Sequence, residues 1–347
     1  MSRKSIFMPT LLIFANPISG RGRGIKIAER LERRLTAERH TVHVFLQRAD
    51  QIPDDQLPDD ALAAIVIGGD GTLRAVAQRL INIRTPKPRA EAVGDAPGSP
   101  HSTASSAAAP HQPEEPGASA TPSASGLKQF LIPPLLIIPT GTANLMAQHL
   151  GIRWNDAHLE DQILATLRAA RTVDLDTATA NGQLLLLIAG VGLDAKVVHI
   201  LEQRRTGPIS YFSYLTPILH ALTTYHYPPL SVTVDGQKIF GPSPALVFIG
   251  NIPEYGTGFP MLPLASPTDR LLDVCILPCR SRTEVMSHVL RAAVGEHLHG
   301  EDVVYLKGNK IQIDAPTPIP IQIDGEAAGH TPLTIHLLPT RLRFIVV

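Results

Sequence analysis

Cysteine, net charge and long apolar runs are all scarce in this chain, and each shortage excludes a class of protein. Cys275 and Cys279 are its two cysteines, too few for a disulfide scaffold or a zinc site, so we expect a reducing compartment. Lysine plus arginine and aspartate plus glutamate both total 31. Because no net charge steers the chain toward nucleic acid, we expect no nucleic-acid partner.

The sequence also contains no stretch typical of a transmembrane helix or of a secretory signal. The longest apolar stretch, Leu184 to Gly192, is shorter than the about 18 residues that a transmembrane helix needs. Residues 1–10 contain Arg3 and Lys4 but no adequate apolar segment, so we expect no signal peptide. A lipid partner would therefore be met from the aqueous side.

The first half of the chain repeats one arrangement, in which an apolar strand runs into a glycine-containing turn and then into a helix. With 347 residues, of which 44% are apolar, the chain is long enough for two domains. The strands are Leu11–Ala15, Ala64–Ile67 and Leu135–Ile138. Short apolar strands that alternate with helices are typical of a parallel sheet covered on both faces. We therefore expect a doubly wound α/β domain over residues 1–174.

The turns after these strands contain residue types that bind phosphate. They are Asn16-Pro17-Ile18-Ser19-Gly20, Gly68-Gly69-Asp70-Gly71-Thr72 and Gly141-Thr142-Ala143-Asn144. Strand carboxyl ends share one edge of such a sheet, where glycines admit a ligand and helix N-termini favour anions. Asp70 is the exception, since a carboxylate repels phosphate unless a metal or a proton transfer involves it. The pattern predicts phosphoryl transfer; the alternative is plain strand-to-helix turns, with Thr142 and Asn144 as helix caps.

The composition changes twice later in the chain. Residues from about 84 to 130 are mostly alanine, proline, serine, glycine and threonine, which predicts a disordered insertion in the first domain. After Arg171, short apolar or alternating runs predict an all-β domain over residues 175–341, an antiparallel sandwich. Helices are expected at Ala195–Glu202, at Tyr211–Thr224 with a kink or break at Pro217, and at Arg282–Val294. The expected strands are Leu184–Ala189, Leu230–Val234, Ala245–Ile249, Leu272–Leu277, Val303–Leu306, Lys310–Ile313, Ile319–Ile323, Thr334–Leu337 and Leu342–Val346.

Five motifs follow one another in order along the chain. They are Asn16-Pro17-x-Ser19-Gly20, Gly68-Gly69-Asp70-Gly71-Thr72, Pro139-x-Gly141-Thr142-x-Asn144, Gly190-x-Gly192-x-Asp194-Ala195 and Asp324-Gly325-Glu326. Together they resemble the diacylglycerol kinase catalytic family, which includes bacterial soluble lipid kinases and the sphingosine kinases. The resemblance implies an N-terminal α/β ATP-binding domain, a C-terminal β-sandwich and an active site in the cleft between them. It also implies that the last strand, residues 342–347, returns to the first domain.

The resemblance implies a reaction and a set of site residues. The γ-phosphoryl group of ATP would pass, with Mg²⁺, to the hydroxyl of diacylglycerol or a related lipid alcohol such as phosphatidylglycerol or a sphingoid base. The residues implied to line the nucleotide phosphates are Asn16, Pro17, Ser19, Gly20, Gly68, Gly69, Asp70, Gly71, Thr72, Thr142 and Asn144. Asp70 would act through the metal or the geometry of the acceptor.

The base that accepts the hydroxyl proton is implied to lie in Asp324-Gly325-Glu326. The alternating strand before them predicts a turn with two exposed carboxylates. We favour Asp324, with Glu326 close behind, because the sequence cannot separate them. Without the other motifs, the same residues would read as a hairpin turn with a solvated glutamate.

A structural Mg²⁺ is implied at the carboxylate of Asp269 and the carbonyl oxygens of Ser266 and Leu271, since hard oxygen ligands suit this ion. The chain departs from the family here, because Thr268 and Arg270 replace an aspartate and a glycine. Whether the metal is bound is therefore open.

Two other functions stay open at this point. An NAD kinase shares Gly-Gly-Asp-Gly-Thr, although the opening and closing motifs fit lipid kinases better. A nucleotide- or lipid-binding protein without activity is favoured only by missing acids, at Leu145 and Thr268. For the leading function, we expect ATP and a lipid alcohol as partners, a cytoplasmic protein peripheral at the inner membrane surface, and transient membrane association. A homodimer is compatible with the sequence.

Overall fold

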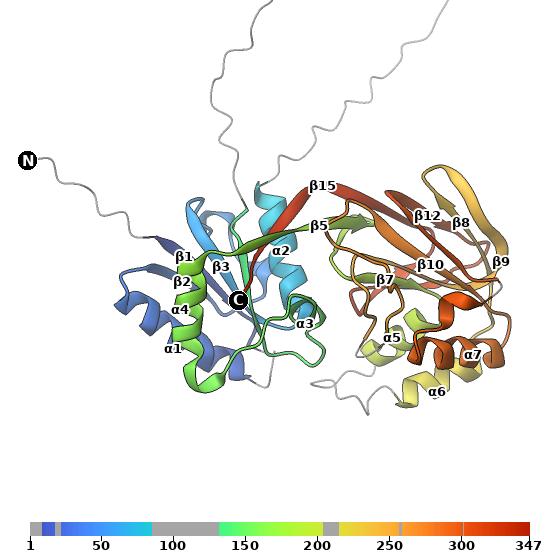
Figure 1. Cartoon of the computed structure of the whole chain (residues 1–347), viewed down its shortest axis with the longest axis horizontal. Helices are drawn as coiled ribbons and strands as arrows, with labels where there is room; N and C mark the ends of the chain where they lie inside the picture. The colour runs from blue at the N-terminus through green and yellow to red at the C-terminus, as the bar shows by residue number, and fades with distance from the viewer. Residues whose placement is uncertain (1–8, 18–21, 85–131, 204–214, 257–258, 301) are drawn as a thin grey trace, which may run out of the picture.

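A computed structural model describes residues 9–17, 22–84, 132–203, 215–256, 259–300 and 302–347, which form two domains side by side (Figure 1). Apart from Arg84, the predicted insertion at 84–130 lies outside the described residues, and so do Ser19 and Gly20. In the described part of the chain, no helix is both long enough and apolar enough to cross a membrane.

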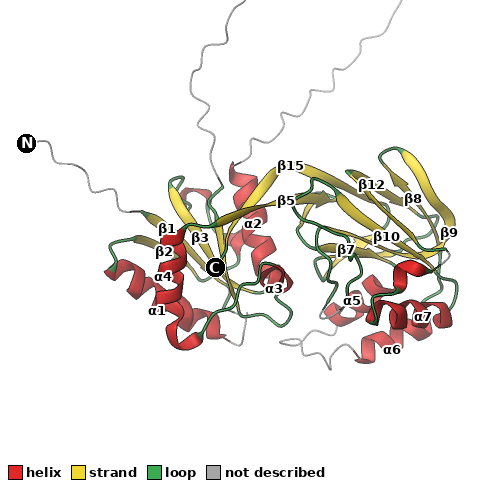
Figure 2. Ribbon diagram, viewed as in Figure 1, coloured by secondary structure: helices red, strands yellow, loops and turns green. Residues whose placement is uncertain are grey.

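The first domain is a parallel sheet with helices on both faces (Figure 2). Its strands, in spatial order, are β2 (Thr41–Phe45), β1 (Thr10–Ala15), β3 (Ala61–Gly68) and β4 (Leu135–Pro139). Its helices are α1 (Arg23–Ala37), α2 (Asp70–Arg84), α3 (Leu145–His149) and α4 (Leu159–Ala169). Side chains of α1 and α4 pack on one face of the sheet and those of α2 and α3 on the other. Since both faces are covered, the central strands are apolar, and the predicted doubly wound α/β domain is confirmed.

The second domain is a sandwich of two sheets that share one long strand. The first sheet contains β8 (Pro229–Val234), β12 (Lys310–Asp314), β15 (Leu333–Ile345), β5 (Thr172–Ala180) and β6 (Gln183–Leu185). The second contains β14 (Glu326–His330), β13 (Pro320–Ile323), β7 (Ile188–Val191), β10 (Leu272–Pro278) and β11 (Val304–Gly308). The shared strand, β9 (Gln237–Gly250), pairs with β8 through its first half and with β7 and β10 through its second half.

The core of the sandwich lies between the sheets, and helices cover the outer face of the second sheet. In β9, Val247 and Ile249 belong to the sandwich core, whereas Leu246 and Phe248 pack in the cluster that includes the helices. These helices are α5 (Leu193–Gln203), α6 (Leu215–Thr224) and α7 (Arg282–Ala293). Short 3₁₀ turns occupy Ala49–Gln51, Asp54–Gln56, Asp156–His158 and His297–His299. The predicted C-terminal β-sandwich is confirmed.

Several predicted element boundaries are wrong for local reasons. Neither β5 nor β14 is predicted, because small and polar residues fill both, and the predicted strand Leu184–Ala189 is divided between β6 and β7. The predicted break at Pro217 is also wrong, since α6 continues through this residue over Leu215–Thr224.

One antiparallel pair, β5 with β15, runs across both domains (Figure 1). The two predicted strands near the end of the chain are one strand here, with a register shift between Leu337 and Arg341. The Thr177 hydroxyl donates to the Thr340 carbonyl at 2.6 Å and so holds the bulge. Beyond the bulge, Phe344 pairs in parallel with Leu135 of β4.

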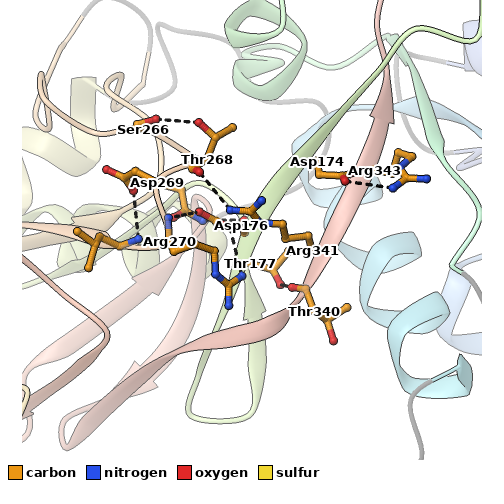
Figure 3. Close-up of polar contacts among 12 residues, drawn as sticks. Asp174, Asp176, Thr177, Ser266, Thr268, Asp269, Arg270, Thr340, Arg341 and Arg343 are labelled. Carbon is orange, nitrogen blue, oxygen red and sulfur yellow. Dashed lines mark hydrogen bonds and ion pairs between the residues drawn. The ribbon is translucent and has the colours of Figure 1, made fainter.

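A buried carboxylate fastens this pair of strands to the second domain (Figure 3). The Asp176 side chain is fully buried. It accepts the Arg341 Nε–H at 2.7 Å and the Arg270 backbone N–H at 2.6 Å. The other end of the Arg341 guanidinium donates to the Thr268 carbonyl at 3.1 Å. The loop between β9 and β10 is therefore attached to the strands that join the domains.

Asp176→Asn is expected to lower the free energy of unfolding by about 3 kcal/mol, because it leaves two arginines beside an uncharged group. Asp174→Asn is the matched control, since Asp174 lies on the same strand and pairs with Arg343 but is 40% exposed. Its expected cost is below about 1 kcal/mol. Urea unfolding followed by circular dichroism measures both, and equal losses would contradict this account of the buried pair.

Candidate active site

Gly68 ends β3 and leads into α2, and only glycine fits there. A Cβ at Gly68 would collide with the side chain of Thr72, in the first turn of α2 (Asp70–Arg84). The Gly68 carbonyl accepts the Thr140 N–H at 3.0 Å. The end of β3 is thus joined directly to the turn that follows β4.

Gly69 and Gly141 bring these two turns into backbone contact. A Cβ on Gly141 would lie 2.7 Å from Gly69 Cα, and a Cβ on Gly69 would lie 3.2 Å from Gly141 Cα. A side chain at either position would therefore push the turns apart. Two of the predicted phosphate-binding turns form one edge at which the backbone can approach a ligand closely.

Asp70 holds the second of these turns through its carboxylate. Its Oδ2 accepts the Leu145 N–H at 2.9 Å, and its Oδ1 accepts the Met146 N–H at 3.1 Å. These N–H groups begin α3 and have no partner inside the helix. Burial raises the pKa of Asp70, and the hydrogen bonds from α3 oppose the rise. Asp70 caps α3, a contact that the sequence pattern did not predict; its action on a metal or an acceptor stays a prediction.

Asn144 precedes α3 but does not cap it. Its backbone is left-handed, with φ of 52°, and its side chain makes no capping bond. Instead, Asn144 Oδ1 accepts the Gly141 N–H at 3.0 Å and Nδ2 donates to the Gly141 carbonyl at 2.8 Å. The interpretation of Asn144 as a helix cap is wrong, since its amide closes the turn that faces Gly69.

Of the other residues predicted to bind the nucleotide, those that the structure describes lie on the same edge of the sheet. Asn16 and Pro17 follow β1, whose last residue, Ala15, pairs with Ile67 of β3. Thr142 is exposed in the turn after β4. Ser19 and Gly20 lie outside the described residues.

Asp324 lies in the turn between β13 and β14, and the prediction that its carboxylate is exposed is wrong. Its Oδ1 accepts the Leu187 and Ile188 N–H groups at 2.8 and 3.2 Å, and its Oδ2 accepts that of Leu186 at 3.0 Å. The acid therefore satisfies the irregular backbone between β6 and β7. Burial raises its pKa to about 6, against the opposing charge of Arg74 and the hydrogen bonds from that backbone.

Glu326 reaches from the second domain to the first turn of α2. Its carboxylate is 47% exposed and forms an ion pair with Arg74, which is 13% exposed. Arg74 also donates to the Ile323 carbonyl at 3.3 Å. A Cβ on Gly71 would lie 2.7 Å from Glu326 Oε1. The Asp-Gly-Glu turn is therefore in contact with the Gly-Gly-Asp-Gly-Thr turn, from which it is separated by most of the chain.

A second polar cluster surrounds Asp194 at the start of α5. The Tyr255 hydroxyl lies 3.4 Å from Asp194 Oδ2, whereas Asp194 Oδ1 and the Tyr225 hydroxyl have no hydrogen-bond partner among the described residues. Burial raises the pKa of Asp194 to about 6. A Cβ at Gly190 would collide with the Asp194 carboxylate, and Gly192 has φ of 121°, a conformation that other residues rarely adopt; this explains the glycines of the fourth motif.

The predicted magnesium ligands Ser266, Asp269 and Leu271 lie in the loop between β9 and β10. Both oxygens of the Asp269 carboxylate are already bound, Oδ2 by Lys307 Nζ at 2.7 Å and Oδ1 by the Leu271 N–H at 3.1 Å. Within the described ranges, no group of three or more histidines, cysteines or acids could hold a metal ion. As arranged here, these residues do not fit a structural Mg²⁺.

Sequence reasoning missed Arg74, Tyr225 and Tyr255. Arg74 alone carried a signal, since it follows Gly-Gly-Asp-Gly-Thr by two positions and lies one helical turn from Asp70. The two tyrosines are distant in sequence from Asp194, so only the fold brings them together.

Two family models match the chain and together extend from residue 10 to residue 346. The Diacylglycerol kinase catalytic domain matches residues 10–180, and the YegS C-terminal NAD kinase beta sandwich-like domain matches residues 188–346. The first match contains the turns around Gly69 and Gly141, and the second contains Asp194, Asp324 and Glu326.

Named relatives share about a quarter of the aligned residues. The diacylglycerol kinase of Bacillus subtilis is 26% identical over 207 residues, which are 58% of this chain and 65% of that protein, less than two thirds of its length. The diacylglycerol kinase of Mycobacterium tuberculosis is 25% identical over 215 residues, 61% of this chain and 69% of that protein. The structure of a diacylglycerol kinase from Bacillus anthracis is 21% identical, with a TM-score of 0.62 over 99% of this chain and 98% of that one. This last likeness is one of fold.

The raised pKa of Asp194 predicts a pH dependence of stability. Between the unfolded pKa of about 4 and the folded pKa of about 6, only the folded state holds the proton. The carboxyl therefore favours folding below this range, and that contribution is lost as the pH rises through 6. From pH 5 to pH 8, the wild type should lose on the order of 1 kcal/mol relative to Asp194→Asn.

Urea unfolding at the two pH values measures this difference. Asp174→Asn is the contrast, because Arg343 lowers the pKa of Asp174, and the stabilisation from a lowered carboxyl pKa is lost only as the pH falls. If the difference in unfolding free energy between the wild type and Asp194→Asn stays constant with pH, the raised pKa of Asp194 is contradicted.

Proposed function

We propose that this chain, which belongs to the diacylglycerol kinase catalytic-domain family, is a lipid kinase that transfers the γ-phosphoryl group of ATP to the hydroxyl of a lipid alcohol. The observation that carries the proposal is the contact between the turn at Gly71 and the Asp324–Glu326 turn of the other domain. Phosphoryl transfer needs a cradle for the donor phosphates and a base at the acceptor, held in line.

The donor side of the proposed site is the edge formed by the turns after β1, β3 and β4. The close approach of Gly69 and Gly141 leaves backbone without side chains at this edge, and amides at helix N-termini favour phosphate. Mg²⁺ bound with ATP would neutralise part of the phosphate charge. Asp70, which accepts two amides of α3, keeps the turn after β4 in register with the turn after β3.

The acceptor side of the proposed site centres on Asp324. A carboxyl with a pKa of about 6 is ionised at neutral pH and basic enough to take a proton from a hydroxyl as it attacks. Its three backbone donors fix its orientation, since both oxygens are held. Glu326 is the poorer base candidate, because Arg74 pairs with it. We assign Glu326 and Arg74 to holding the two turns together.

The lipid is proposed to reach the site from a membrane surface on the side of α6 and α7. Exposed apolar side chains gather on these helices: Ile218, Leu219, Met286, Val289 and Leu290. Figure 2 shows both helices on the same side of the second domain. Peripheral attachment at the cytoplasmic face of the inner membrane and a homodimer stay predictions.

An NAD kinase is the second candidate, because the model that matches residues 188–346 is described as NAD kinase beta sandwich-like. Labelled-ATP turnover separates the two candidates when diacylglycerol, phosphatidylglycerol, sphingosine and ceramide are supplied in mixed vesicles and NAD in solution. We expect the label in one of the lipids, and diacylglycerol is the acceptor that we expect most. Label in NAD alone would contradict the assignment as a lipid kinase. No label in any acceptor would favour a binding protein without activity.

Asp324→Asn is expected to lower kcat by about 10²–10⁴-fold, the typical contribution of a general base, while nucleotide affinity stays close to that of the wild type. On the acidic side of its pH profile, kcat of the wild type should increase as the pH is raised through 6, since only the ionised carboxylate of Asp324 accepts the proton. Asp235→Asn is the matched control: Asp235 also precedes a glycine in a left-handed turn and accepts the Asn309 and Lys310 amides. Equal activity of the two variants would remove Asp324 from the base role.

Gly141→Ala is expected to weaken binding of a non-hydrolysable ATP analogue by about tenfold or more, equivalent to about 1.4 kcal/mol. The added methyl group would displace Gly69 and widen the edge that faces the phosphates. Gly24→Ala is the control, since its methyl group would be 3.5 Å from its nearest neighbour. Titration calorimetry compares the two, and unchanged affinity in Gly141→Ala would place the phosphates elsewhere.

A further inference from the structure

An ammonium group lies where the sequence predicted a metal ion. Lys307 Nζ is 2.7 Å from Asp269 Oδ2 and donates to the Leu264 carbonyl at 3.0 Å. It also lies 3.3 Å from Asp273 Oδ2. Two carboxylates and one backbone carbonyl thus converge on a single positive charge, an oxygen set that would suit a hard cation.

The burial of Asp273 depends on that charge. Its side chain is fully buried on β10. Tyr305 donates to its Oδ1 at 2.6 Å, but its Oδ2 has no hydrogen bond among the described residues, so the ion pair with Lys307 is the contact found for this oxygen. A buried carboxylate without a compensating charge is strongly unfavourable. Lys307 supplies the compensating positive charge beside Asp273.

The opposite side of the same loop is also held by side-chain cations (Figure 3). Arg341 donates to the Thr268 carbonyl at 3.1 Å. Arg270 has φ of 65°, a left-handed conformation that favours glycine. Its cost is offset because the buried Asp176 accepts the Arg270 backbone N–H at 2.6 Å and also pairs with its guanidinium. Arginine thus keeps a turn for which glycine would be the usual choice, and adds a positive charge to the loop.

We infer that the ammonium group of Lys307 takes the place of a divalent cation in the loop of residues 264–271. The loop and the buried end of β10 then need no metal, and any divalent ion that the protein requires enters with the nucleotide. A divalent ion beside Asp269 would lie within contact distance of the Lys307 ammonium group, and the repulsion between the two positive charges opposes its binding.

Lys307→Met tests the inference, because it removes the charge and keeps most of the chain length. Without nucleotide, the thermal midpoint of the wild type should be the same in EDTA and in millimolar Mg²⁺ or Ca²⁺. The variant should have a lower midpoint in EDTA and recover part of the loss when either ion is added, since Asp269, Asp273 and the Leu264 carbonyl would then accept a metal. Lys307→Arg should behave like the wild type.

Lys238→Met on β9 is the matched control, since Lys238 is an exposed strand lysine; it should change neither the midpoint nor its response to metal. Direct binding is measured with Mn²⁺ by calorimetry, again without nucleotide, so the result does not depend on kinase activity. We expect no Mn²⁺ bound by the wild type, and binding by Lys307→Met that a second change, Asp269→Asn, abolishes.

Three results would overturn the inference. One is a wild-type midpoint that falls in EDTA, and another is Mn²⁺ bound by the wild type and lost in Asp269→Asn. The third is a midpoint of Lys307→Met equal to that of the wild type. If Lys307→Met does not fold, the wild-type measurements still decide between a lysine and a metal.

Discussion

The pairing of β5 with β15 is the constraint on which the rest of the structure depends. The two strands pair from Ala180 with Ile335 at one end to Thr172 with Ile345 at the other, and they belong to both domains. Asp176 fixes this pair to the second domain through Arg341 and Arg270. Since the domains cannot move freely about such a connection, it helps to hold the Asp324 turn against α2.

Three carboxylates in this protein accept backbone N–H groups at turns and at the start of a helix. Asp70 accepts two amides at the start of α3, and Asp324 accepts three between β6 and β7. Asp235 accepts the amides of Asn309 and Lys310. Turns without side-chain bulk leave N–H groups unpaired, and one carboxylate can accept several of them at once. The same acids are therefore fixed in position before any substrate arrives, which a proposed base such as Asp324 requires.

Local patterns in the sequence predict the strands and turns well, and long-range contacts poorly. Glycine turns after apolar strands gave both the α/β domain and the edge that contains Gly69 and Gly141. By contrast, Asp324 lies in an Asp-Gly hairpin that predicts exposure, and only the distant backbone at Leu186 encloses it. The replacement of a metal by Lys307 could not be predicted either, because 38 positions separate it from Asp269 and its partners meet only through the pairing of β10 with β11.

The return of β15 changes what counts as a domain in this chain. Because Phe344 completes the first sheet beside Leu135, the first domain is discontinuous in sequence, and the second is an insertion between β5 and β15. A separately produced first domain would need those two strands connected directly. Conversely, a chain nicked at a loop of the second domain would leave two fragments that remain associated along the same ladder of hydrogen bonds, so cleavage there would not by itself release either half.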